Sequence, residues 1–301
     1  MTRPTRQTPA GQAYLDLQNR ARREGRGTQE LLTLYVVERW LARLSASPHA
    51  EQFVLKGGML LAAFDARRPT ADADALALDI AHHEATVVAR VVEIARQPVA
   101  DDGVRFVTET VTARTIRDEA LYAGVRIAMD TRIATATVRF RLDVNFGDPI
   151  TPEPQLIHLP ALRAGSAPIR LIGYPIETVL AEKLATAIAL GAANTRVRDY
   201  VDVYTLTGRH DLIHAGVRAA LSATATFRGT TLGPLSSALD DLVALRRATY
   251  IAYRASLGPD GRRLPDEFGD VVAAVVAFAD PLAEAAPTHT TWLPKQRRWS
   301  S

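Results

Sequence analysis

Residues Lys56 to Asp79 read KGGMLLAAFDARRPTADADALALD, with two adjacent glycines ahead of an apolar run. Because glycine has no Cβ, Gly57 and Gly58 predict a sharp turn from a short strand over residues 52–55 into a helix over residues 59–64. Exposed N–H groups at the start of such a helix can hold a phosphate. The glycine pair therefore predicts a phosphate-binding turn.

A pair of carboxylates, Asp72 and Asp74, follows at the start of a second expected strand. Side chains two residues apart on a strand project from the same face, so the pair can share a divalent metal. A third carboxylate, Asp143, lies in the strongly β-patterned run Thr137 to Phe146 and is expected on a neighbouring strand. Because all three ligands are hard oxygens, Mg²⁺ is the expected ion. The alternative for an isolated Asp-x-Asp is a solvent-facing turn or strand end.

The order of these motifs resembles that of nucleotidyltransferases of the DNA polymerase β type: Gly-Gly, a helix, Arg-Pro-Thr-x-Asp-x-Asp and a later strand aspartate. Further along, residues 177–183 and the Arg-Asp-x-x-Asp pattern over residues 198–202 are similar to the AbiEii/AbiGii branch. This branch includes MenT-like toxins of toxin–antitoxin pairs. The similarity spans residues 54–207, about half of the chain.

This resemblance implies an α/β (α+β) fold, with a polymerase β-type nucleotidyltransferase mixed sheet flanked by helices and a helical C-terminal lobe. We expect residues 1–160 to form the nucleotidyltransferase lobe, including its N-terminal helices. Residues 161–301 are expected to form a helical C-terminal lobe that completes the nucleotide pocket.

The resemblance also implies a Mg²⁺-dependent enzyme that transfers a nucleoside monophosphate from a nucleoside triphosphate (NTP) to an acceptor. The expected acceptor is the 3′ end of tRNA, so that translation is blocked, and a cognate antitoxin is an expected partner. The implied catalytic residues are Asp72, Asp74, Asp143, Lys183 and Asp199, of which Asp72, Asp74 and Asp143 hold the metal. The implied nucleotide-binding residues are Lys56, Gly57, Gly58, Thr70, Lys183 and Arg198.

Lysine is scarce in this chain, which has only Lys56, Lys183 and Lys295 among many arginines. Lys56 and Lys183 stand at family motif positions, where a compact ammonium suits a point contact with a triphosphate. A plain surface lysine is the alternative at both positions. Asp199 and Asp202 are three residues apart and share a helix face. By the resemblance, Asp199 lies near Lys183 and is functional, whereas Asp202 is a structural partner.

Three positions depart from the pattern of the relatives. Thr70 stands where they usually carry Ser, and Met59 replaces a Thr or Ser, which removes a side-chain contact to phosphate but leaves the backbone ones. Ala73 replaces a larger apolar residue between the aspartates. In some toxin relatives a hydroxyl near the acidic pair is modified by the antitoxin. We hypothesise that a phosphate on Thr70 would repel the triphosphate and switch the enzyme off.

Composition narrows the class of protein. The 301 residues suffice for one large domain or two close lobes, and the absence of cysteine excludes disulfides, thiol nucleophiles and thiolate zinc sites. No stretch approaches the roughly 20 uncharged residues of a membrane span. The first ten residues are polar and lack an apolar signal region, so we expect a cytoplasmic protein. A net charge of +3 and a pI near 9.3 are compatible with an RNA or nucleotide partner.

The rest of the chain has a mainly helical pattern. The expected helices cover residues 11–23, 28–44, 82–96, 176–189, 195–207, 211–221, 235–253 and 266–279. Strands are expected over residues 104–111, 125–129 and 135–145, with a hairpin turn near residues 130–133 and a connector over residues 149–168. Basic and aromatic residues in the tail, 287–301, could stack on RNA, but a packed or frayed terminus is favoured. The arginine-rich residues 20–26 favour a solvated face, with nucleic-acid contact as the alternative.

Other motifs argue against competing chemistry. His210 and His214 have the spacing of a zinc helix, but no third ligand is evident, and a helix that starts at Asp211 is simpler. No P-loop, Gly-x-Gly-x-x-Gly or Gly-x-Ser-x-Gly motif is present, which argues against ATPase, Rossmann and α/β-hydrolase classes. Two alternatives remain: a non-catalytic nucleotide- or RNA-binding regulator, and a nucleotidyltransferase that acts on a protein or small molecule. The complete set of three aspartates argues against the regulator.

Overall fold

The computed structural model describes residues 3–117, 123–284, 287 and 289–300. The chain divides into two compact units. The first comprises Met1–Gly147 and Gln155–Gly173, and the second comprises Asp148–Pro154 and Tyr174–Ser301. The division expected after residue 160 therefore falls inside the first unit.

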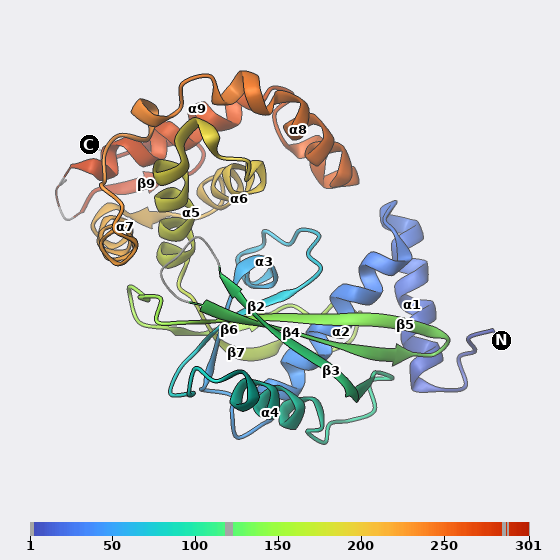
Figure 1. The fold of residues 1–301 in the computed structure, drawn as a ribbon. Helices are drawn as coiled ribbons and strands as arrows, with labels where there is room; N and C mark the ends of the chain where they lie inside the picture. The colour runs from blue at the N-terminus through green and yellow to red at the C-terminus, as the bar shows by residue number, and fades with distance from the viewer. Residues whose placement is uncertain (1–2, 118–122, 285–286, 288, 301) are drawn as a thin grey trace. The chain divides into compact units, whose positions relative to one another are not determined.

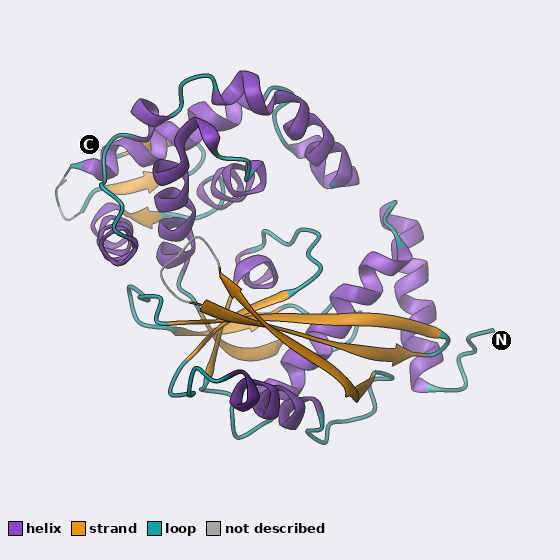
Figure 2. Cartoon of the chain, in the orientation of Figure 1, coloured by secondary structure: helices purple, strands orange, loops and turns teal. Residues whose placement is uncertain are grey.

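The first unit is built on a seven-stranded sheet with the strand order β3-β4-β5-β2-β1-β7-β6 (Figure 1). Two neighbouring pairs, β2 with β5 and β1 with β7, are parallel, and the other pairs are antiparallel. This is the mixed sheet flanked by helices that the sequence predicts, as Figure 2 also shows. Its elements are α1 (Pro9–Glu24), α2 (Thr28–Ser45), β1 (Phe53–Lys56), α3 (Gly57–Leu60), η1 (Leu61–Phe64), β2 (Ala73–Ala77), α4 (Glu84–Ala95), β3 (Arg105–Arg117), β4 (Ala123–Ile133), β5 (Ala136–Phe146), β6 (Gln155–Leu159) and β7 (Ile169–Gly173).

One face of the sheet is apolar and is covered by α2 and α4. Trp40 of α2 is fully buried, and its ring packs against Phe53 of β1 and Phe140 of β5. The indole of Trp40 also donates a hydrogen bond to the carbonyl of Val91 in α4. Alternation along β5, with Val138, Phe140 and Leu142 buried on this side, leaves the odd-numbered residues for the opposite face. That opposite face carries the acidic residues.

The turn between β4 and β5 differs from its expected position. It consists of Ala134 and Thr135, and Ala134 has a positive φ of 50°. The expected turn near residues 130–133 is wrong because no Asn-Gly or Asp-Gly pair marks the true one. The shift changes which residues of β4 face those of β5.

The expected connector over residues 149–168 is also wrong in part. Strand β6 lies within it and pairs with β7, which in turn pairs with β1 through Leu55 and Gly173. Ile157 and Leu159 of β6 are buried, so this short strand has the alternation of a sheet edge. Its flanking prolines and glycines hid that alternation in the sequence.

The second unit is mainly helical and carries a small antiparallel sheet of order β10-β9-β8. Its N-terminal segment is joined to α5 through Thr178, whose hydroxyl donates to the Thr151 carbonyl at 2.7 Å. The elements are α5 (Ile176–Leu190), η2 (Gly191–Ala193), α6 (Val197–Thr207), β8 (Leu212–Ile213), α7 (His214–Arg228), η3 (Leu235–Ala238), α8 (Leu242–Ser256), η4 (Gly258–Arg263), α9 (Phe268–Ala279), η5 (Asp280–Ala283), β9 (Thr291–Leu293) and β10 (Arg298–Trp299).

Two expected helices of this unit begin elsewhere. The helix expected over residues 211–221 starts at His214, because Leu212 and Ile213 pair with β9 instead. The helix start expected at Asp211 is therefore wrong. The helix expected over residues 235–253 is interrupted, since Asp241 adopts a left-handed backbone with a φ of 59° between η3 and α8.

The C-terminal tail packs onto its own unit. Trp292 is fully buried and donates a hydrogen bond to the Thr207 carbonyl at 2.7 Å. The rings of Phe278 and Trp299 pack against it. Trp292 and Phe278 are core residues, and the half-buried Trp299 packs against both, so the tail aromatics serve packing. Throughout the described ranges, every helix is too short or too polar to cross a lipid bilayer.

Candidate active site

Four charged residues form a row across the sheet of the first unit. Strand register places Lys56 of β1 opposite Asp74 of β2, and Asp74 opposite Asp143 of β5. Asp143 in turn lies opposite Arg126 of β4. Residues directly opposite on neighbouring strands project from the same face, with strands about 4.8 Å apart. Asp74 and Asp143, two carboxylates from distant parts of the sequence, are thus neighbours, and we call this pair the acidic row.

The third predicted carboxylate, Asp72, stands just before β2 on the same side as Asp74. The pKa of the Arg126 guanidinium supports this clustering. The hydrogen bonds from Arg126 to Asp143 raise this pKa most, and burial of the guanidinium lowers it. The negative charges of Asp143, Asp72 and Asp74 raise the pKa further. One arginine therefore senses all three predicted carboxylates.

The glycine pair turns the chain beside this row. Gly57 has a φ of 67°, and a Cβ added there would lie 1.9 Å from Oδ2 of Asp74. A Cβ on Gly58 would lie 2.8 Å from Oγ1 of Thr70. Both positions need glycine because the backbone approaches these side chains closely. The helix that starts here is a four-residue α-turn, Gly57–Leu60, followed by the 3-10 turn Leu61–Phe64, rather than a single helix over residues 59–64.

Thr70 lies between the glycine turn and the acidic pair. Its hydroxyl is 3.3 Å from both the carbonyl oxygen and Oδ1 of Asp72, to which it donates long hydrogen bonds. Thr70 therefore packs over Gly58 and orients toward Asp72. The sequence placed Thr70 among the nucleotide-binding residues, and its position beside the predicted ligands is compatible with that role.

Arg126 is the residue of this row that the sequence analysis missed. Its Nε donates to Oδ1 of Asp143 at 2.7 Å and its Nη2 to Oδ2 at 2.5 Å, a bidentate pair in which Asp143 is buried. A hairpin turn at Ala134 and Thr135 makes residue 126 the partner of residue 143, whereas the turn expected at residues 130–133 did not. The position of the turn was the signal that could have identified Arg126.

The donor set of Asp72, Asp74 and Asp143 suits a hard divalent cation such as Mg²⁺. Within the described part of the chain, no group of three His, Cys, Asp or Glu residues is already gathered closely enough to hold a metal. Asp143 is instead engaged by Arg126. A carboxylate offers about four lone-pair sites, so Asp143 can keep a hydrogen bond to Arg126 and still act as a ligand. The three aspartates suit a magnesium ion because their ligand atoms are carboxylate oxygens and because all three lie on the same side of the sheet.

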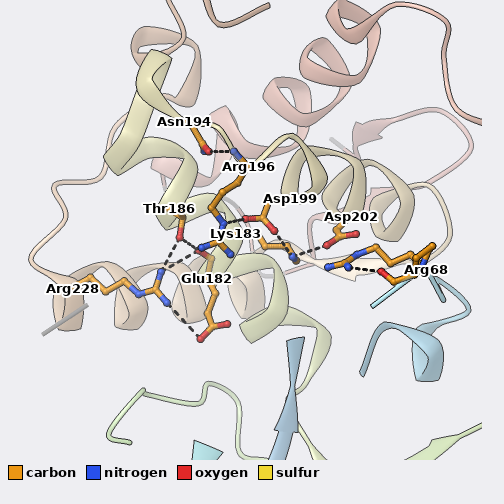
Figure 3. Close-up of polar contacts among 10 residues, drawn as sticks. Arg68, Glu182, Lys183, Thr186, Asn194, Arg196, Asp199, Asp202 and Arg228 are labelled. Atoms are coloured by element: carbon orange, nitrogen blue, oxygen red, sulfur yellow. Dashed lines mark hydrogen bonds and ion pairs between the residues drawn. The ribbon is translucent and has the colours of Figure 1, made fainter. Parts of the chain in front are cut away.

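The second unit contains a separate charged cluster around Lys183 of α5 (Figure 3). Its ammonium donates to Oδ1 of Asp199 and to Oδ2 of Asp202, both at 2.8 Å. Both aspartates belong to α6 and are almost fully buried. Burial raises the pKa of Asp199, but the charges of Lys183 and Arg196 outweigh it and lower that pKa to about 2. Lys183 and Asp199 are therefore a charged pair near neutral pH.

The arginine that donates a hydrogen bond to this cluster is Arg196, which the sequence analysis did not single out. Nε of Arg196 donates to Oδ2 of Asp199 at 2.6 Å, while Arg198, the residue directly before Asp199, is exposed and acts on Asp199 through its charge. The two differ because Arg196 is three residues before Asp199 and shares its helix face. That spacing was the signal in the sequence.

Comparison with known proteins identifies the family. The sequence model described as "Nucleotidyl transferase AbiEii toxin, Type IV TA system" matches residues 39–274, well over half of the chain. The chain belongs to the AbiEii nucleotidyl transferase toxin family. This AbiEii protein is therefore a transferase, and its family implies an NTP substrate and a cognate antitoxin.

Solved structures support the fold of the AbiEii protein. It is similar to MenT4, a nucleotidyltransferase toxin of Mycobacterium tuberculosis H37Rv, with 17% identity and a TM-score of 0.56 over 92% of this chain and 90% of that chain. It is also similar to JHP933 of Helicobacter pylori, with 15% identity and a TM-score of 0.50 over 85% of this chain and 93% of that chain. No curated protein matches the sequence. At these identities the likeness concerns the fold alone.

Proposed function

We propose that this AbiEii protein transfers a nucleoside monophosphate from an NTP to the 3′ end of tRNA and thereby blocks translation. The observation that carries the proposal is the register that sets Asp74 beside Asp143, with the Gly57 backbone packed against the Asp74 carboxylate. In a nucleotidyltransferase family, such a juxtaposition of carboxylates and a glycine turn serves phosphoryl chemistry.

In this reaction a hydroxyl oxygen of the acceptor forms a bond to the α-phosphorus of the NTP, the bond from that phosphorus to pyrophosphate breaks, and the hydroxyl proton passes to solvent. Asp72, Asp74 and Asp143 are the proposed magnesium ligands. The ion, when bound, would supply neutralisation of the triphosphate charge and lower the pKa of the attacking hydroxyl. Asp143, buried and fixed by Arg126, is held in one orientation for this task.

The triphosphate is assigned to the glycine turn and its neighbours. The backbone of Gly57 and Gly58 admits close approach of a phosphate because neither residue has a side chain in the way. Lys56, in the same row as Asp74, supplies a positive charge on this face of the sheet. Thr70, whose hydroxyl lies over Gly58, is proposed to touch the pyrophosphate portion.

Lys183, Asp199 and Arg198 of the second unit are also assigned to the nucleotide. Two buried aspartates accept hydrogen bonds from the Lys183 ammonium and fix its position. An ordered ammonium binds a triphosphate oxygen more tightly than a mobile one, because it loses less conformational entropy on binding. Asp199 is the positioning residue for Lys183, and Arg198 adds a solvent-facing positive charge.

Labelled nucleotides test the proposal. The purified protein is incubated with each α-³²P-labelled NTP, MgCl₂ and total RNA, and the products are separated and sequenced at their 3′ ends. The expected result is label on tRNA 3′ ends that requires MgCl₂ and is lost in Asp72→Ala. Label on a protein or on a small molecule would show that the acceptor is not tRNA. Full transfer by Asp72→Ala would refute the mechanism.

The bidentate pair of Arg126 with Asp143 favours a second candidate function, a nucleotide- or RNA-binding regulator without catalysis. In such a protein the arginine would neutralise Asp143 permanently. The same experiment separates the two candidates, since a regulator binds nucleotide or RNA but leaves every macromolecule unlabelled.

A further inference from the structure

The face of the sheet that carries Asp143 continues beyond the acidic row as an open surface on β3, β4 and β5. These are the three long strands of the sheet, and they lie side by side at one edge (Figure 1). Register shows which of their residues share the face of Asp143: the odd-numbered residues of β5 and the even-numbered residues of β4. The apolar side of the same strands is covered by α2 and α4, whereas Arg132, Thr137 and Arg141 on the opposite side are exposed.

Besides Arg126 of the row and Arg105, which lies opposite Arg132, this face carries four arginines that we call the arginine strip: Arg114, Arg132, Arg139 and Arg141. Arg141 and Arg139 follow Asp143 at alternate positions of β5, so Arg139 lies about 13 Å from Asp143 at about 3.3 Å per residue. Arg114 of β3 pairs with Arg126 beside Asp143, and Arg132 of β4 pairs with Thr137 farther out. The strip begins at the acidic row and runs away from it.

The charges of the strip are mostly available. Arg114, Arg132 and Arg141 are exposed, and neither Arg132 nor Arg141 forms an ion pair with another described residue. Arg139 is the exception, because it donates to Asp130 at 2.8 Å and to Thr112 at 2.9 Å. The strip therefore presents a positive surface of single sign over most of its length.

The absence of an apolar centre favours nucleic acid over a protein partner. Protein interfaces usually have an apolar or aromatic core. None of the large apolar side chains that are exposed in the described part of the chain lies on β3, β4 or β5. The positions between the arginines are occupied by small or polar residues such as Ala128, Thr112 and Thr137. Arginine with hydroxyl side chains is the composition of a phosphate-binding surface.

We propose that the arginine strip binds the phosphate backbone of the acceptor RNA and leads its 3′ end to the acidic row. This inference rests on the proposed transfer to RNA and deepens it by naming the surface that holds the substrate. Because the contacts are to phosphate, the strip fixes the position of the RNA strand without reading its sequence. Its loss therefore weakens RNA binding and leaves nucleotide binding unchanged.

The test compares two double variants that each remove two exposed positive charges from the first unit. Arg132→Gln/Arg141→Gln changes the strip, and Arg22→Gln/Arg23→Gln changes α1 as the matched control. Affinity for a fluorescent tRNA is measured by anisotropy over a range of KCl concentrations, and thermal melting verifies folding. A third variant, Arg132→Lys/Arg141→Lys, keeps the charge.

We expect the glutamine strip variant to lose tRNA affinity on the order of tenfold, with its log–log salt slope reduced by about 1 to 2, since each lost phosphate contact removes about 0.7 to 0.9. The α1 control and the lysine variant should stay near the wild type. In transfer assays, the strip variant should raise the KM for tRNA with the KM for NTP and kcat unchanged.

Equal affinity of the strip variant and the wild type would overturn the assignment, as would an equal loss in both glutamine variants, which would indicate diffuse charge. A different result would make the strip a protein-binding surface instead. In that case the strip variant would bind tRNA as the wild type does, but would no longer retain an acidic protein that the immobilised wild type retains. Because anisotropy needs no turnover, the strip is tested even if no RNA becomes labelled. That absence of label contradicts only the proposed function.

Discussion

At the scale of single residues, Asp143 is the most constrained side chain of the acidic row. It is buried, it accepts two hydrogen bonds from Arg126, and its neighbour across the sheet is another aspartate, Asp74. Two adjacent carboxylates repel each other, and the guanidinium offsets that repulsion while no cation is bound. Arg126 therefore holds the Asp143 carboxylate in one orientation beside Asp74.

Removal of this guanidinium should destabilise the first unit. We expect Arg126→Gln to lower the free energy of unfolding by about 1 to 3 kcal/mol, because a buried carboxylate loses its partner. The more exposed pair of Arg139 and Asp130 provides the control, and Arg139→Gln should cost about 0 to 1 kcal/mol. Urea denaturation of both variants checks the difference. Equal costs would show that Arg126 does not stabilise the acidic row.

A second residue-scale prediction concerns acid stability through Asp199. Its folded pKa of about 2 lies below the usual 3.8, so it contributes stability that is present above about pH 4 and is lost as the pH falls toward 2. A shift of that size corresponds to about 2 kcal/mol. Between pH 5 and pH 2.5, Asp199→Asn should therefore lose less stability in urea than the wild type.

The exposed Asp211 offers the matched control for this measurement. Asp211→Asn should follow the wild-type dependence of unfolding free energy on pH. If Asp199→Asn and Asp211→Asn lost the same unfolding free energy between pH 5 and pH 2.5, the charged pair of Asp199 with Lys183 would contribute nothing to the stability of the second unit.

At the scale of elements, the turn from β1 into α3 fixes the distance between backbone and carboxylate. Gly57 has a left-handed backbone, and its Cα hydrogens face the Asp74 side chain. Gly25, at the end of α1, has a similar φ of 63° but open space around it. The two glycines have a similar positive φ, and close packing distinguishes Gly57 from Gly25.

Alanine substitution at both positions isolates that packing. Gly25→Ala should cost about 1 kcal/mol from backbone strain alone. Gly57→Ala should cost more, because its Cβ would displace Asp74, and transfer activity should fall on the order of tenfold or more. Unfolding free energies and initial transfer rates of the two variants give the comparison. Similar results for both would contradict the close approach of the turn to Asp74.

Local patterns in the sequence were enough for part of this arrangement. The Asp-x-Asp pair, the glycine turn and the β pattern around Asp143 each depend on neighbouring residues, and the structure has them on adjacent strands. Strand β6 could not be predicted, because the prolines on either side of it are typical of a loop. The hairpin turn at Ala134 could not be predicted either, because it contains no glycine. Arg126 depends on that turn, so its partnership with Asp143 required the three-dimensional register.

At the scale of the whole molecule, charge is organised by face rather than by net value. The net charge of +3 is small, yet one side of the sheet carries an acidic row followed by the arginine strip. The acidic row can attract a cation, and the neighbouring arginine strip can attract a polyanionic strand to the same surface. Lysine is placed selectively as well. Of the three lysines in the sequence, Lys56 and Lys183 both lie beside aspartates.

The central claim is that Asp74 and Asp143 act together in nucleotidyl transfer, and the initial rate of label transfer to tRNA in Asp143→Asn tests it most directly. Asp79→Asn is the matched control: it removes the same charge just beyond β2, at an exposed position whose positive φ asparagine tolerates. With folding verified by thermal melting, we predict that Asp143→Asn and Asp74→Asn lose transfer by on the order of a hundredfold or more, whereas Asp79→Asn keeps it. Wild-type transfer by folded Asp143→Asn would contradict the account.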